Sequence, residues 1–531
     1  MSHWIIAPVV LPALLAPLIG YVMRHDIVLA RVASAAGTVA LFLIALGLAF
    51  WAADGGTHVY RLGDWPAPFG IVLVLDRLSA LMVLLTASLA LIVLWHAIAT
   101  GWDAKGRHFH ALFQFQLMGI FGAFLTGDAF NLFVFFEVLL IASYGLMVHS
   151  GGKVRLQAGL QYLVMNLAGS TLFLFALGTM YATTGTLNMA DLAVKVPLIP
   201  ADEGAMVRVA AVLLLIVFMI KAALFPVQFW LPGTYANAPA PVAALFAIMT
   251  KVGAYAIIRL HTLAYGPQSS PTAGLVEEWL FPAAMVTVAL GAIGVLAAKR
   301  LMPLLSFSVI GSMGTLMLAV APQDPYATET ALYYLVHSTF SAAALFLMAD
   351  LVITRRGTDT LSVRPPLLQN GLFAALFFAG AIAMAGMPPL SGFLGKLLIL
   401  DALRDPDLMP WAWSGILIGS LVTIVGFARA GSMLFWKSTA ASVPEGAEPI
   451  DAEPRPAPAT AAEVGPTVTL LALLAALAVL AGPATEYMRA AGTQLFEPEG
   501  YIDAVLAPVE KPEGLDPLKA DAPDLHAEEE H

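Results

Sequence analysis

Long apolar segments recur along almost the whole chain. Of its 531 residues, 59% are apolar and 12% are charged, whereas about a quarter of the residues in a soluble domain are charged. A transmembrane helix needs about twenty apolar residues. The chain is therefore predicted to be an all-α polytopic membrane protein with about fourteen transmembrane helices, over residues 4–23, 29–52, 76–99, 109–127, 129–149, 157–182, 207–231, 239–264, 276–298, 301–321, 329–353, 370–402, 411–436 and 465–488.

Basic residues gather in alternate connections between these segments, and the connections between them are neutral or acidic. Lys- and Arg-rich connections lie on the cytoplasmic side of a membrane. With an even number of crossings, both termini are then predicted to lie on the outer side of the cell (inner) membrane. The basic connections carry Arg24 and Arg31, Lys105 and Arg107, Lys153 and Arg155, Lys299 and Arg300, and Arg355, Arg356 and Arg364.

The net charge of −10 arises outside the apolar segments. Residues 444–463 and 490–531 hold 16 of the 36 acidic residues and three of the 26 basic ones, which is typical of solvated loops and tails. No basic residue precedes the segment 4–23, so it is predicted to be a retained helix and not a signal peptide. The absence of cysteine excludes iron–sulfur clusters held by thiolates, Cys-ligated zinc and disulfides, and no cofactor is predicted.

Five ionisable side chains lie near the middle of apolar segments. A charge at bilayer depth costs at least a few kcal/mol, so such residues usually face the bundle interior, pair with one another and line an ion path. The alternative is a structural ion pair or, for the histidine, a packed ring. Both signs of charge together with a titratable imidazole favour a proton relay. The five are Glu137, Lys221, Lys251, His337 and Lys396, with Lys221 as the expected partner of Glu137.

Prolines interrupt two apolar segments close to these lysines. Pro226 follows Lys221 by five residues, and Pro388 and Pro389 shortly precede Lys396. Proline removes a backbone donor, and a broken membrane helix is tolerated where it faces protein or water. The seventh and twelfth helices are thus predicted to be discontinuous. They lie five segments apart, an odd number, which predicts two inverted five-helix repeats with ion sites at the breaks.

These features divide the chain into six predicted parts. A first repeat contains helices 4–8 and a second, inverted repeat contains helices 9–13. The linker after the second repeat is rich in Pro, Ala and Glu, a composition typical of disorder. The parts are three N-terminal helices (1–107), the first repeat (108–264), the second repeat (265–437), a disordered cytoplasmic loop (438–464), a last transmembrane helix (465–489) and an acidic C-terminal tail (490–531).

Other polar residues near the ends of the segments are predicted to have no part in the relay. Interfacial anchoring is the expected role of charged and histidine side chains at these positions. No further metal ligand accompanies His108 and His110, which are predicted to lie in a solvated loop, and no metal site is predicted. The predicted anchors are Asp76, Arg77, Arg259, His261, Asp350, Asp401 and Arg429.

The stretches that carry the five buried ionisable residues resemble a known family. They are similar to the proton-translocating antiporter-like family shared by respiratory complex I, membrane-bound hydrogenases and the Mrp multisubunit cation/proton antiporters. Within it, the forms FFEV…ASYGL and GTLNMADL are most similar to the D subunit of Mrp. The stretches include FNLFVFFEVLLIASYGLMVH, KAALFPVQFWLPGTYANAPAPVAALFAIMTKVGAYAIIR, LLSFSVIGSMGTLMLA and AGMPPLSGFLGKLLIL.

This resemblance implies a fourteen-helix fold with inverted repeats and with the five residues as a hydrophilic axis along the membrane. The chain is therefore predicted to be an ion-translocating subunit of a monovalent cation/proton antiporter, with Na⁺ as the favoured cation. Such a secondary transporter, which is not an enzyme, serves pH and sodium homeostasis. Its predicted partners are other membrane subunits, monovalent cations, protons and the lipid bilayer, and no nucleic acid.

Two alternatives use the same residues. A proton-pumping module in the membrane arm of a redox complex, of the complex I or hydrogenase type, would need the same relay. A non-conducting scaffold would use the charges only as structural pairs. A solute permease is disfavoured, because no cluster of Asn, Gln and Trp stands among the central polar groups to hold an organic molecule.

Overall fold

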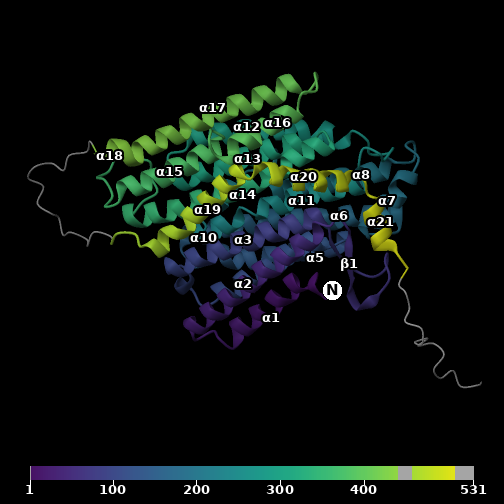
Figure 1. The fold of residues 1–531 in the computed structure, drawn as a ribbon, viewed down its shortest axis with the longest axis horizontal. Helices are drawn as coiled ribbons and strands as arrows, with labels where there is room; N and C mark the ends of the chain where they lie inside the picture. Colours follow the sequence, from purple (N-terminus) through teal and green to yellow (C-terminus); the bar gives the residue numbers. More distant parts are fainter. Residues whose placement is uncertain (1, 440–456, 509–531) are drawn as a thin grey trace, which may run out of the picture.

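The computed structural model describes residues 2–439 and 457–508. Most helices run side by side along the long axis of the molecule, from α1 at one edge to α17 at the other (Figure 1). In the described part of the chain, eleven helices are long and apolar enough to cross a membrane, and three further apolar helices are shorter. This architecture agrees with the predicted polytopic helical protein. The number of crossings stays a prediction.

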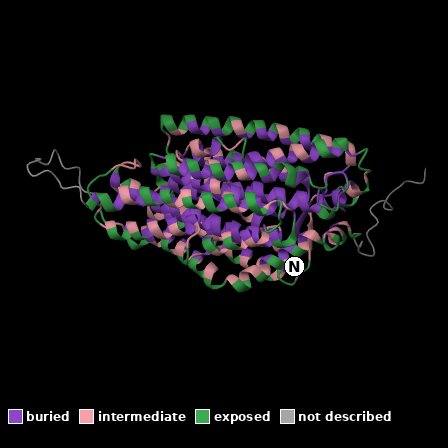
Figure 2. Cartoon of the chain, turned by 90° about the horizontal axis from the view of Figure 1, so that it is seen from above, coloured by how far each residue is buried: buried purple, intermediate pink, exposed green. Residues whose placement is uncertain are grey.

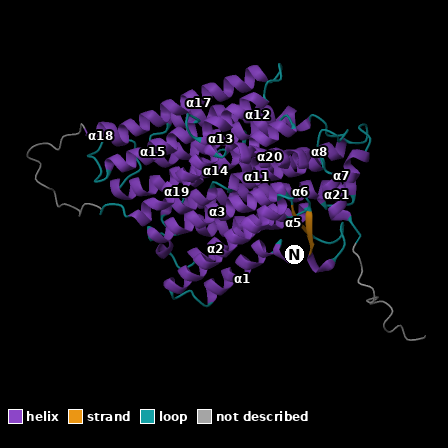
Figure 3. Ribbon diagram, in the orientation of Figure 1, coloured by secondary structure: helices purple, strands orange, loops and turns teal. Residues whose placement is uncertain are grey.

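The first third of the chain forms six helices and one small sheet, which Figure 3 shows in orange at the end of the bundle. Each helix coincides with one predicted segment. Asp26, Asp76 and Asp128 accept backbone N–H groups at three of the helix starts, as N-caps do. The elements are α1 (Ala7–Tyr21), α2 (Ile27–Ala52), β1 (His58–Arg61), β2 (Val72–Leu75), α3 (Arg77–Ala99), α4 (Phe109–Leu125), α5 (Ala129–Met147) and α6 (Lys153–Thr184).

The middle third contains the first break. The predicted helix over 207–231 is divided between two helices, as expected from Pro226, and the next predicted helix is divided as well. The elements are α7 (Met189–Lys195), α8 (Ala205–Ala222), α9 (Trp230–Tyr235), α10 (Ala240–Phe246), α11 (Met249–Leu263), α12 (Leu275–Ala297) and α13 (Leu301–Val320).

The last third contains the second break. The segment 370–402 forms two helices on either side of Pro388 and Pro389, as predicted. The elements are α14 (Pro325–Arg356), α15 (Asn370–Ala385), α16 (Ser391–Ala402), α17 (Met409–Gly431), α18 (Lys437–Thr439), α19 (Ala461–Val479), α20 (Ala481–Phe496) and α21 (Glu499–Leu506).

The small sheet departs from the all-helical prediction. β1 and β2 pair antiparallel, with His58 opposite Leu75. The four residues of β2 are buried, and Leu73 also bridges to Thr126 after α4. Four apolar residues are far too few to cross a bilayer, so the apolar segments of the sequence do not predict this strand.

The last predicted helix also differs. A continuous helix over 465–489 is expected, but α19 ends at Val479 and a new helix begins at Ala481. Pro483 explains the break, because it has no N–H to continue the hydrogen bonds of α19. Part of the expected acidic tail is helical, since α20 and α21 reach Leu506 and bury Tyr501. The ranges 440–456 and 509–531, which hold most of the predicted loop and tail, lie outside the described residues.

The core lies around α11 and α14. Most residues of α14 are buried, which is the expected state of a helix that faces protein on all sides. It packs against α10, α13, α15, α16, α19 and α20. Figure 2 shows the buried residues in the interior of the bundle, with exposed side chains along the outer helices.

The basic connections meet at one end of the bundle. A cavity of about 600 Å³ there is lined by Lys153 and Arg155, by Arg300, and by residues 357–359 that follow α14. The N-terminus and α21 lie at the opposite end (Figure 1). These basic connections therefore lie at the end of the bundle opposite the N-terminus and α21.

Candidate ion-translocation site

Glu137 and Lys221 bind the same face of α6. The Ser170 hydroxyl donates to Glu137 Oε1, and Lys221 Nζ donates to Asn166 Oδ1 at 3.0 Å. Asn166 and Ser170 are four residues apart, so they are neighbours on one helix face. Among the described residues, Glu137 and Lys221 form no ion pair within 4.0 Å. The expected partnership is therefore not a direct contact: the Glu137 charge acts on Lys221 from a longer distance, and each group binds a polar side chain of α6.

Lys221 lies in the last turn of α8, at the first break. Ala223 adopts a left-handed conformation with φ +55° and ends the helix there. The end of a helix leaves carbonyls without helical partners and carries a partial negative charge, which favours an ammonium group. Trp230 Nε1 binds one of these carbonyls, that of Ile220, at 2.9 Å. A cavity of about 10 Å³ beside Lys221 is close to the smallest that holds a water.

Lys251 follows a helix break that was not predicted from the sequence. The helical run is interrupted at Ala247 and Ile248, between α10 and α11, and no proline stands at the interruption. The Lys251 side chain is fully buried, and its Nζ has no hydrogen-bond partner among the described residues. Gly253 lets α11 press against the end of α8, because a Cβ there would lie 2.6 Å from the Ala222 nitrogen. The first two lysine sites therefore belong to packed helices.

His337 joins α14 to the second break. Its Nδ1 lies 2.9 Å from the Ser391 hydroxyl at the start of α16. Its Nε2 has no partner in the described part of the chain and faces Gly392, where a Cβ would lie 2.8 Å from it. The charges of Lys396 and Lys251 both act on the His337 ring. The ring thus lies within electrostatic reach of two of the predicted lysines.

Lys396 binds the free end of α15. Its Nζ donates to the Ala385 carbonyl at 2.9 Å and to the Ser420 hydroxyl of α17 at 2.8 Å. Ala385 is the last residue of α15, so its carbonyl has no partner within that helix. A cavity of about 20 Å³ adjoins the ammonium group, enough for one water. Hydroxyl groups predominate in its polar lining: Ser308, Ser312, Thr315, Tyr334, Ser420 and Thr423.

These polar neighbours were not predicted from the sequence. Asn166, Ser170 and Ser420 each bind one of the predicted charged groups. Little in the sequence marks these residues as functional, since small polar side chains are common in membrane helices and usually bond to their own backbone. Only the position on the inner face distinguishes them, and the sequence does not reveal which face points inward when the helix is apolar all round.

Two predicted anchors form a buried ion pair. Arg259 and Asp76 are 3% and 2% exposed and bind through two hydrogen bonds, of 2.5 and 2.8 Å. An interfacial role is therefore wrong for both. The reason is tertiary: α11 lies in the core, so a residue near its end still faces protein. Burial makes the bidentate geometry necessary, since an unpaired buried charge is costly.

Another predicted anchor and the predicted loop histidine are also buried. Asp350, 4% exposed, accepts from Trp102 Nε1 at 2.9 Å and lies 2.9 Å from His96 Nε2. His110 lies 3.1 Å from Asp103, which also binds Arg31. Burial alone would raise the pKa of the Asp103 carboxyl, but the hydrogen bonds from His110 and Arg31 and the Arg31 charge lower it below its usual range. These groups tie the connections to the bundle.

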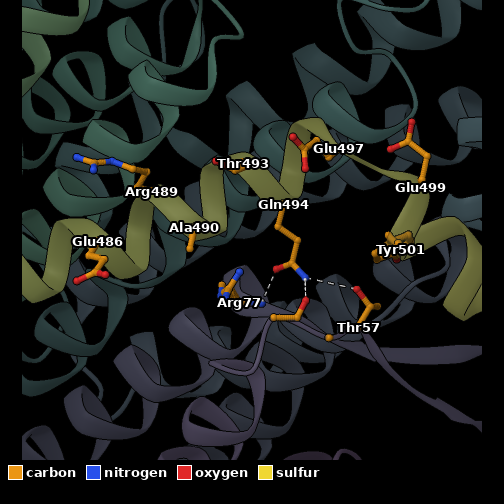
Figure 4. A pocket seen from close by; sticks show the side chains of 13 residues that line it. Thr57, Arg77, Glu486, Arg489, Ala490, Thr493, Gln494, Glu497, Glu499 and Tyr501 are labelled. Atoms are coloured by element: carbon orange, nitrogen blue, oxygen red, sulfur yellow. Dashed lines mark hydrogen bonds between the residues drawn. The ribbon is translucent and has the colours of Figure 1, made fainter.

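A wide cavity lies away from the five predicted relay residues. It measures about 900 Å³ and lies between α20, the loop before β1 and the start of α3. Figure 4 shows Gln494 of α20 reaching across to Thr57 and to the backbone at Arg77. None of the five predicted relay residues lines it. The cavity mixes Glu and Arg side chains and contributes nothing to the relay geometry.

Comparisons with known proteins agree with this arrangement. The sequence profile of the family described as "NADH:quinone oxidoreductase/Mrp antiporter, TM" matches residues 126–425. The D subunit of a probable K(+)/H(+) antiporter of Rhizobium meliloti is 39% identical over 96% of this chain and 98% of that protein. The D subunit of a Na(+)/H(+) antiporter of Bacillus subtilis is 37% identical over 95% of this chain and 100% of that protein.

Solved structures show the same fold. A chain of the Mrp complex from Dietzia sp. DQ12-45-1b matches 95% of this chain and 100% of its own length, with a TM-score of 0.86 and 28% identity. A chain of respiratory complex I from Thermus thermophilus matches 93% of this chain and 99% of its own length, with a TM-score of 0.76 and 25% identity. The fold is therefore that of the membrane subunits in both kinds of complex.

Proposed function

The chain belongs to the NADH:quinone oxidoreductase/Mrp antiporter family, and we propose that it acts as the D subunit of a multisubunit monovalent cation/proton antiporter. Its similarity to antiporter D subunits over 95% or more of the chain carries this proposal. The alternative, a proton-pumping module of a redox complex, rests on the weaker likeness to complex I. Antiport is favoured because several relatives above 30% identity are named as antiporter subunits.

Protons move, in this proposal, along Glu137, Lys221, Lys251, His337 and Lys396. Each group is held so that it can exchange a proton with a neighbour or with water. Two of the lysines bind uncharged oxygens, Asn166 Oδ1 and the Ala385 carbonyl, and these stabilise the ammonium form without fixing it in an ion pair. The small cavities beside these two lysines have room for the water molecules that would complete the path.

The transported cation and the orientation are parts of the same proposal. The names of the relatives include both Na⁺ and K⁺. We propose Na⁺ as the transported cation, and the experiment compares it with K⁺. We place the basic end of the bundle in the cytoplasm and both termini on the outer side of the cell membrane, according to the positive-inside rule. The two lysines beside broken helices support the proposal that helices 4–8 and 9–13 are inverted repeats.

The proposal predicts cation-dependent proton flux that requires this subunit. Vesicles with the complete complex should acidify or alkalinise on addition of Na⁺ or K⁺, and vesicles prepared without this chain should not. The measurement is the fluorescence of a pH probe inside the vesicles. Equal flux with and without the chain would contradict the proposal. Flux that requires a quinone or another electron acceptor would favour the redox alternative.

Substitutions of His337 distinguish a proton-carrying role of this residue from a packing role. His337→Gln is expected to slow proton flux about as much as His337→Ala, by roughly 100-fold, because glutamine can bind Ser391 but cannot carry a titrating proton. His337→Lys should restore part of the flux, since a buried lysine can release its proton. Flux is measured in vesicles across the pH range. Native flux in the glutamine variant would mean that the ring is a packing residue.

A further inference from the structure

Three arginines line a pocket at the basic end of the bundle. The pocket measures about 530 Å³ and lies between the end of α14, the start of α15 and the residues before α19. It contains none of the five relay residues. We call it the arginine pocket, and it is lined by Arg355, Arg356, Arg364, Pro365, Pro366, Leu367, Leu368, Gln369, Phe373 and Pro458.

Two of the three charges have no counterion among residues 2–439 and 457–508. Arg356 is 8% exposed and donates to the carbonyls of Leu434 at 3.3 Å and Ser362 at 2.7 Å. Arg364 donates to the Arg356 carbonyl at 3.2 Å. Neither arginine forms an ion pair within the described residues. Carbonyl groups satisfy N–H donors but do not neutralise a charge, and a buried charge without a counterion is costly.

The third arginine is only partly compensated. Arg355 pairs with Glu463 at 3.0 Å, and its guanidinium lies over the Phe373 ring at 5.6 Å from the centroid. The Nε atoms of Arg355 and Arg356 have no hydrogen-bond partner in the described part of the chain. In the part of the chain that the structure describes, three guanidinium groups at the pocket therefore stand against one carboxylate. Planar guanidinium groups match the oxygens of a phosphate group in geometry and charge.

Apolar side chains stand beside the charges. Leu368 lines the pocket and is 65% exposed, and Leu372 at the start of α15 is 38% exposed. α19 begins shortly after the pocket residue Pro458, and most of its residues are not buried. The pocket therefore lies where the basic end of the bundle meets its outward, apolar surface. A ligand that fits both has an anionic head and apolar chains.

We propose that the arginine pocket binds the phosphate headgroup of an anionic phospholipid, with the acyl chains against Leu368 and Leu372. Basic pockets between transmembrane helices on the cytoplasmic side bind such headgroups. Inorganic phosphate shares the headgroup chemistry, but it would leave the apolar side of the pocket unused. The larger cavity at the same end is less suitable, because Arg300 there is paired with Asp359 and Asp350 also lines it.

The test measures lipid bound to the complete complex. The complex is reconstituted in phosphatidylcholine with a small fraction of spin-labelled phosphatidylglycerol, and the immobilised fraction of the label is recorded. Each arginine near a membrane surface contributes about 1 kcal/mol of attraction, or about a fivefold change in affinity. Arg364→Gln and Arg355→Gln should each weaken binding about fivefold. Arg364 is exposed, so its variant should fold normally.

A matched control lies at the same end of the molecule. Arg300→Gln removes a half-exposed arginine that does not line the arginine pocket, and it should leave lipid binding unchanged. Equal binding by wild type, Arg355→Gln and Arg364→Gln would overturn the proposal, as would an equal loss in Arg300→Gln. Displacement of the spin label by inorganic phosphate at millimolar concentration would identify a free-anion site and would also overturn the lipid assignment.

Discussion

Replacing Glu137 by alanine is expected to abolish cation-dependent proton flux while the complex still assembles. The carboxylate is the acidic end of the proposed relay and acts electrostatically on Lys221 without touching it. Loss of a positioned proton-transfer group typically costs 100-fold or more, roughly. Glu137→Asp should keep part of the flux, because the charge survives about one methylene away. The readouts are vesicle flux and the subunit content of the purified complex.

A second variant separates the charge from its hydrogen bond. Ser170→Ala removes the hydroxyl that donates to Glu137, a loss of about 1 kcal/mol or about fivefold. It should therefore slow flux far less than Glu137→Ala. Glu278→Ala is the control, because this glutamate is exposed in the first turn of α12. Normal flux in assembled Glu137→Ala would remove Glu137 from the relay.

Two of the three helix breaks that carry a proline in the described part of the chain were predicted from the sequence, and the break at Pro483 was not. Pro226 and the pair Pro388–Pro389 mark the ends of α8 and α15, because a residue without an N–H leaves a gap in the hydrogen-bond pattern that the sequence shows directly. The break between α10 and α11 has no such residue. Close packing accompanies it, since Gly253 brings α11 against the end of α8, and packing between distant segments is not visible in one sequence.

Buried charges near helix ends were the main errors. Asp76, Arg259 and Asp350 lie where a membrane helix normally meets water, so the sequence predicts anchors. In the structure, neighbouring parts of the protein enclose these three side chains, which are 2%, 3% and 4% exposed. Depth along one helix can be counted from the sequence, but enclosure by neighbouring helices cannot. For the same reason, Ser420 was not predicted as a neighbour of Lys396, since its position there depends on how α17 packs against α16.

Replacing Lys251 by methionine is expected to abolish flux and at the same time to stabilise the protein. The Lys251 amine is fully buried and has no hydrogen-bond partner among the described residues. An unsatisfied buried polar group costs about 1–3 kcal/mol, and methionine fills a similar volume without that cost. A group retained at such a cost is better explained by function than by stability. Thermal unfolding of the complex in detergent and vesicle flux are the two measurements.

Two comparisons make the result specific to Lys251. Lys251→Arg should give neither flux nor added stability, because arginine keeps its proton and would be a permanent buried charge without a counterion. Lys153→Met, at an exposed lysine at the start of α6, should change neither quantity. A destabilised Lys251→Met protein would indicate a structural role, and near-normal flux in Lys251→Arg would favour the scaffold alternative. Loss of flux together with higher stability in Lys251→Met would identify Lys251 as a proton carrier. Replacing a residue with a purely structural role would instead lower the stability of the protein.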